Sequence, residues 1–157
     1  MNRLSPHQEV ALSPRLPQSI YNALIRRSID LRSLYRHAAA SCEPGLGMVL
    51  GENAQTLGLL IADLQEHQRI SGIKPYAHGS WRGTARRYAA GWLVHATARR
   101  DTAWIRELAH HESALLHAFE RAIAVLPPES ARVLRRQLPR LNGIHLDMGS
   151  LVGSARY

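Results

Sequence analysis

The chain has 157 residues and a mass of 17.5 kDa, which suits one domain built around a single hydrophobic core. Hydrophobic residues make up 45% of the chain, which argues against an unfolded protein, and the single cysteine, Cys42, excludes an internal disulfide framework and any cysteine-built zinc or iron–sulfur site. The formal net charge is +8, and every basic residue except Lys74 is an arginine.

Residues 1–17 contain three prolines and no sustained hydrophobic period, so we expect a loose N-terminal arm there. This segment lacks the continuous apolar core of a secretory signal. No apolar run in the chain approaches the roughly 18 residues of a membrane span. We therefore expect a soluble cytoplasmic protein that does not bind membranes.

The first half of the chain predicts two long helices, at about residues 18–40 and 44–70. The predicted buried seams have members three or four residues apart. These members are Tyr21, Leu24, Ser28, Leu31, Tyr35 and Ala38, then Leu46, Leu50, Asn53, Leu57, Leu60, Leu64 and His67. Pro44 can start the second helix, and Ser71–Gly72 can end it. Because the connection is short, the two helices should form an antiparallel hairpin.

Residues 71–79 should form a loop, with Ser80 as the N-cap of a helix over residues 81–98. The apolar face of that helix would carry Trp81, Ala85, Tyr88, Trp92 and His95. We expect Arg99–Asp101 to interrupt the chain, with Asp101 capping the next helix.

The last part of the chain predicts two further helices, at about 102–125 and 128–147, separated by Pro127–Pro128. Their seams are Ile105, Leu108, Glu112, Leu115, Phe119, Ala122 and Leu126, then Ala131, Leu134, Leu138, Leu141, His145 and Met148. Pro139 and Gly143 should kink the last helix or break its end. Residues 149–157 should be a C-terminal tail.

These elements predict an all-α protein with one domain over residues 18–148. Four strong helices start near residues 18, 44, 102 and 128. The helix at 81–98 would be about 27 Å long at ~1.5 Å per residue, long enough to return along the bundle. Two antiparallel hairpins joined by such a crossover form a ferritin-like four-helix bundle, here with an extra helix in the crossover.

Several short segments occur in an order that resembles a family of uncharacterised bacterial ferritin-like four-helix-bundle proteins, a domain of unknown function. They are Tyr35–Ala39, Ala62–Gln65, Gly79–Gly83, Glu107, Glu112, Ala118–Ile123, Leu126–Pro127, Gln137 and His145. The resemblance covers about residues 18–148. It implies a fold and a link to stress physiology, without an established activity.

Charged groups at seam positions mark the candidate site, because a buried charge is costly unless it is paired. If the last two helices are antiparallel, Glu112 and His145 should be neighbours in the core. Glu107, His111 and Glu52 would lie at a similar height, so iron or manganese are candidate cofactors. A dinuclear site needs a Glu from each of two helices and a Glu-x-x-His from each of the others, which this chain does not supply. The remaining hypotheses for this site are a mononuclear or vestigial metal site and a structural Glu112–His145 pair.

Three functions remain open from the sequence. The first is a non-catalytic structural or stress-associated protein that forms homo-oligomers through the apolar face of helix 81–98. The second is a metal-binding protein with a degenerate carboxylate–histidine site. The third is a nucleic-acid or polyanion binder that uses Arg82, Arg86, Arg87, Arg99 and Arg100.

No motif in the sequence predicts catalytic residues. The sequence shows no Ser-His-Asp set, phosphate-binding loop or dinucleotide-binding glycine motif. Cys42 is either a bystander in the turn between the first two helices or a reactive thiolate favoured by the start of the second helix.

Overall fold

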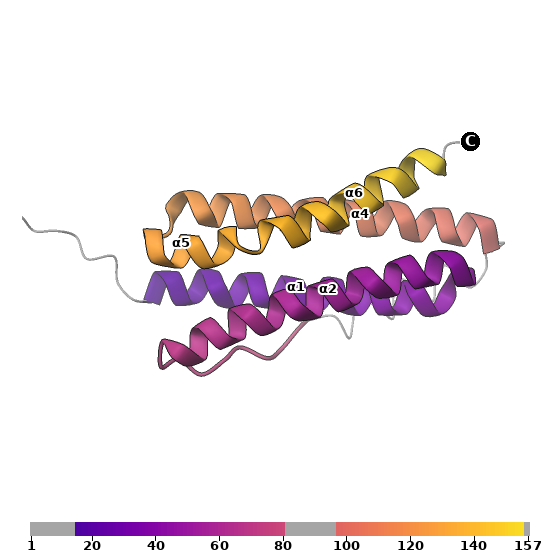
Figure 1. Ribbon diagram of the computed structural model, residues 1–157. Helices are drawn as coiled ribbons and strands as arrows, with labels where there is room; N and C mark the ends of the chain where they lie inside the picture. Colours follow the sequence, from indigo (N-terminus) through magenta and orange to yellow (C-terminus); the bar gives the residue numbers. More distant parts are fainter. Residues whose placement is uncertain (1–14, 81–96, 156–157) are drawn as a thin grey trace, which may run out of the picture.

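The computed structural model describes residues 15–80 and 97–155. Within these ranges the chain is helical and has no strand, which confirms the all-α prediction. The helices are α1 (Arg15–Ser41), α2 (Pro44–Ile70), α4 (Thr97–Val125), α5 (Pro128–Arg135) and α6 (Leu138–Ser154). α5 and α6 follow each other as one broken rod, so four rods form a helical bundle (Figure 1). The predicted helix at 81–98 lies outside the described residues, apart from positions 97 and 98, which belong to α4.

The first hairpin consists of α1 and α2, which pack along their whole length. Near its open end, Gln68 Nε2 donates to Asn22 Oδ1 at 2.7 Å. Near its closed end the two backbones approach closely, because a Cβ added to Gly47 would lie 2.7 Å from the carbonyl oxygen of Ala39. These contacts join the start of α1 to the end of α2, so the predicted antiparallel hairpin is confirmed.

The second hairpin consists of α4 and the rod formed by α5 and α6. Tyr21 Oη donates to the carbonyl oxygen of Ser130 at 2.7 Å, which places the starts of α1 and α5 at one end of the bundle. At the other end the backbone N–H of Glu43 donates to Asp101 Oδ2 at 3.3 Å. α1 is therefore antiparallel to α4, and α2 and α4 run in the same direction (Figure 1).

The core contains the residues that the hydrophobic period predicted. All predicted seam residues of the first helix and of the helix at 102–125 are buried, and so are those of α2 except His67. The last rod differs, because Leu138 is half-buried and His145 is exposed, while Gln137 and Ile144 occupy core positions. Leu134, Leu141 and Met148 are buried as predicted, so the two errors at Leu138 and His145 are each one residue along the same face of the rod.

The last rod is broken earlier and ends later than the sequence predicts. α5 ends at Arg135, and Pro139 lies in the first turn of α6, where its missing N–H costs no helical hydrogen bond. The expected interruption of the helix at 128–147 is therefore confirmed next to Pro139, whereas the expected end at 147 is wrong. α6 continues to Ser154, so residues 149–154 are helical rather than part of a tail.

The start of α4 also differs from the prediction made from the sequence. Arg99–Asp101 does not interrupt the chain but lies within the first turns of α4. The Asp101 side chain accepts a hydrogen bond from Glu43 in the turn between α1 and α2, so it serves a tertiary contact and not a cap.

The connection after α2 forms hydrogen bonds with both helices of the first hairpin. Gly72 has φ 73°, a backbone conformation that favours glycine, and the N–H of Ile73 returns to the carbonyl oxygen of Gln68 at 2.9 Å. Ser80, the predicted N-cap, donates from its backbone N and its Oγ to the two carboxylate oxygens of Asp30, both at 2.6 Å. The chain thus leaves the described part beside the middle of α1. Among the described helices, none combines the length and hydropathy needed to span a membrane.

Candidate functional site

The centre of the bundle contains a hydrogen bond between a buried carboxylate and an imidazole. Helical spacing on α4 puts Glu112 on the same face as Leu108 and Leu115, so its side chain is only 1% exposed. His145 Nδ1 on α6 lies 2.8 Å from Glu112 Oε2, while its side chain is 50% exposed. The predicted contact between Glu112 and His145 is confirmed, although His145 reaches it from the flank of α6.

The electrostatics of Glu112 are dominated by burial. Burial raises the pKa of its carboxyl group, and the hydrogen bond and charge of His145 offset only part of this effect. The raised pKa means that this group favours folding at acid pH, and that the contribution is lost as pH rises through the folded-state pKa. The other carboxylate oxygen, Oε1, is buried and has no hydrogen-bond partner among the described residues.

The other two rods each contribute a polar side chain to the same region. Tyr35 on α1 is fully buried, and Asn53 on α2 is 3% exposed. Burial raises the pKa of Tyr35, the charges of Glu112 and Asp147 raise it further, and the nearby Asn53 side chain lowers it. We call Tyr35, Asn53, Glu112 and His145 the polar layer, which takes one member from each rod.

Three buried atoms of the polar layer have unused hydrogen-bonding capacity. They are Tyr35 Oη, Asn53 Nδ2 and Glu112 Oε1. Buried polar groups normally have hydrogen-bond partners, so these three atoms are exceptions within the core. Tyr35 was not among the sequence candidates, and the signal for it was a hydroxyl at a predicted seam position.

The remaining metal candidates do not join the polar layer. Glu107 and His111 bind each other on α4, with Nε2 and Oε1 2.9 Å apart, and both side chains are partly exposed. Glu52 is exposed on α2, because the neighbouring Asn53 takes the inward position. Within residues 15–80 and 97–155, no group of three or more His, Cys, Asp or Glu side chains is arranged to hold a metal ion.

A second polar contact joins the two hairpins near the break in the last rod. Gln137 Nε2 donates to Asp63 Oδ2 at 3.1 Å, and Arg140 pairs with the same oxygen. The hydrogen bond from Arg140 holds the pKa of Asp63 below its usual range. Side chains at and just after the break between α5 and α6 thus bind α2. The sequence did not predict this contact.

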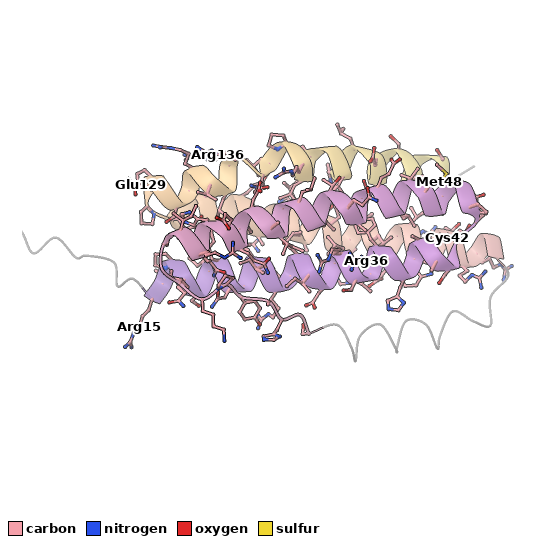
Figure 2. The ribbon with its side chains drawn as sticks, turned by 60° about the horizontal axis from the view of Figure 1, so that its bottom comes forward. Arg15, Arg36, Cys42, Met48, Glu129 and Arg136 are labelled. Carbon is pink, nitrogen blue, oxygen red and sulfur yellow. The ribbon has the colours of Figure 1, made fainter. Side chains whose placement is uncertain are left out.

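Cys42 does not have the environment of a reactive thiolate. It is half-buried next to α2, and burial together with the neighbouring Asp101 carboxylate raises the pKa of its thiol to about 12. Figure 2 shows its place at the end of α1. The thiol therefore stays protonated at neutral pH, and the reactive alternative is wrong.

Two of the five arginines predicted to contact a polyanion belong to the described residues. Arg82, Arg86 and Arg87 lie outside the described residues. Arg99 is exposed on α4, and Arg100 is half-buried.

Comparison of the sequence with known proteins adds no family to these observations. No family model, no curated protein and no solved structure matches the chain. The function is therefore argued from the residues of the bundle alone.

Proposed function

We propose that this chain is a ferritin-like, non-catalytic bundle that acts as a structural or stress-associated protein by self-association. The connectivity supports the fold part of this proposal. α2 and α4 run in the same direction, and α2 ends at the opposite end of the bundle from the start of α4, so the two antiparallel hairpins are not joined by a short turn. A long crossover between two antiparallel hairpins is the ferritin-like arrangement.

Exposed apolar side chains on α2 and α6 carry the proposal of self-association. Met48, Leu59 and Leu146 are 69%, 57% and 69% exposed. Met48 and Leu59 are eleven residues, or about three helical turns, apart, so they lie on one side of α2. Because Arg140 of α6 pairs with Asp63 of the antiparallel α2, Leu146 lies along the bundle axis between the levels of Met48 and Leu59. We infer that these exposed apolar side chains lie in a contact between copies of the chain.

The face of α2 and α6 carries little of the positive charge that opposes association of two copies. Two copies with a net charge of +8 repel each other over most of their surfaces. α2 has no arginine or lysine from Pro44 to Gln68, and the one arginine of α6, Arg140, is paired with Asp63. The face of α2 and α6 is therefore where repulsion between copies is weakest. The contact expected on helix 81–98 lies outside the described residues.

Polar substitutions on this face should weaken the self-association. A Met48→Gln, Leu146→Gln variant should elute later than the parent and show a lower molar mass by light scattering at equal concentration. Val125→Gln on α4 removes a side chain of similar exposure, 60%, and should leave the mass of the oligomer unchanged. A parent chain that stays monomeric at high concentration would contradict the proposal.

We propose metal binding as a second function, on the evidence of Glu112 Oε1. This buried oxygen has no partner, and it lies in a layer that also offers an imidazole, a phenol and an amide. Oxygen and imidazole ligands suit iron or manganese. The layer supplies only one carboxylate, which fits a mononuclear site better than a dinuclear one.

Metal analysis of the purified protein tests this second function. Protein prepared without chelator should contain close to one iron or manganese per chain, and Glu112→Ala should lose it. His117→Ala is the control, because His117 is an exposed histidine on the same helix, paired with Glu120. A parent content below about a tenth of an equivalent would exclude a resident metal.

A further inference from the structure

Two arginines on α1 lie close together without an acidic partner. Arg32 is half-buried and lies over Gly58 of α2, where an added Cβ would be 3.8 Å from its Nη1. Its Nε is buried without a hydrogen-bond partner. Arg36 is exposed and one helical turn further along, on the same side of α1. No hydrogen bond or ion pair joins either guanidinium to another described side chain, whereas Arg140 is paired.

The two positive charges act on each other. Burial lowers the pKa of Arg32, and the charge of Arg36 lowers it further. The nearest acidic residue along α1, Asp30, is already bound by Ser80. An unpaired cation that is partly withdrawn from water beside a like charge is unfavourable, and a bound anion would relieve both effects.

The α2 side of this pair leaves room for such an anion. Gly51, Gln55 and Gly58 are spaced four and three residues apart, so they share one face of α2. A Cβ added to Gly51 would meet nothing within 4 Å, and Gln55 is exposed with an amide that can donate. The neighbouring surfaces of α1 and α2 thus offer two guanidinium groups, an amide and open space at Gly51.

We propose that Arg32 and Arg36 form a binding site for a phosphate-type oxyanion, with Gln55 as an additional donor. Guanidinium groups bind phosphate through two parallel N–H bonds, which a lone ammonium group cannot do. Free phosphate and the phosphates of a nucleic-acid strand share this chemistry. Gln55 lies on the same side of α2 as Met48 and Leu59, but both arginines lie on α1, outside the polar layer and the apolar face, so phosphate binding does not depend on the proposed function.

Titration with inorganic phosphate at low ionic strength tests the site. Arg32→Gln and Arg36→Gln should each weaken phosphate binding by about tenfold or more, the size expected for a lost charge-assisted pair. Arg132→Gln, an exposed arginine on α5, makes the same change in net charge and should weaken binding less than about twofold. Thermal unfolding followed by circular dichroism must show that all three variants fold like the parent.

A second arm uses a single-stranded DNA oligonucleotide and identifies the source of the phosphate. If the site takes nucleic acid, the same two variants should weaken oligonucleotide binding and reduce its salt dependence, while Arg132→Gln should not. If it takes free phosphate only, the oligonucleotide should bind all variants equally. Equal weakening of phosphate binding by all three variants, or no phosphate binding by the folded parent, would overturn the proposal.

Discussion

His145→Ala should reduce the free energy of unfolding by about 1–3 kcal/mol at pH 7. The change removes the 2.8 Å hydrogen bond to Glu112, whose side chain is 1% exposed, and leaves its Oε2 only a 3.5 Å contact with Ser113 Oγ. Because the imidazole is half exposed, water can enter after its removal, so the cost stays below the ~3–5 kcal/mol of a fully buried pair. Urea unfolding at a fixed pH measures the difference.

The matched control for this prediction is His117→Ala. His117 pairs with Glu120 on the exposed side of α4, so its loss should cost less than about 0.5 kcal/mol. Equal destabilisation by the two variants would mean that the contact at the centre of the bundle contributes no more than a surface pair.

Gly47→Ala should destabilise the protein by about 1–2 kcal/mol. An added Cβ would lie 2.7 Å from the carbonyl oxygen of Ala39, which belongs to the backbone of α1 and cannot rotate away. Forcing the two helices apart costs about 1–3 kcal/mol, and the gain from replacing a helical glycine offsets only part of it, about 0.5–1 kcal/mol. The midpoint of urea unfolding reports the loss.

Gly51→Ala on the same helix isolates the steric part of this effect. A Cβ at Gly51 would meet nothing within 4 Å, so the variant should gain about 0.5–1 kcal/mol from its helix propensity alone. A stabilised Gly47→Ala variant would show that α1 and α2 do not approach as closely as described here.

The helical period predicts most of the core because a buried stripe must repeat about every 3.6 residues. It places Tyr21, Leu57 and Phe119 correctly, and all three are buried. The period fails at two positions of the last rod, where Gln137 and Ile144 are buried in place of Leu138 and His145. Leu141 and Met148 are buried as predicted, so these errors are local and leave the predicted partner of His145 unchanged.

The candidate site was predictable in part. A charged residue on an apolar seam identified Glu112, and antiparallel counting across the turn near residue 127 identified His145 as its neighbour. The long imidazole side chain bridged the remaining distance from the flank of α6. Tyr35 was placed on the seam but not among the site residues, because a seam tyrosine usually packs as a large apolar residue and only the structure shows its hydroxyl without a partner. The same one-residue uncertainty applies to α2, where Asn53 takes the inward position and the predicted site residue Glu52 is exposed.

A double-mutant cycle on Glu112 and His145 tests most directly whether the two side chains tie α4 to α6 inside the core. Glu112→Met replaces the buried carboxylate with an apolar side chain of similar length and should cost little. In that background His145→Ala should have almost no effect, which gives a coupling free energy of about 1–3 kcal/mol for the pair. If His145→Ala costs the same whether residue 112 is glutamate or methionine, the two side chains do not interact and the account of the polar layer is contradicted.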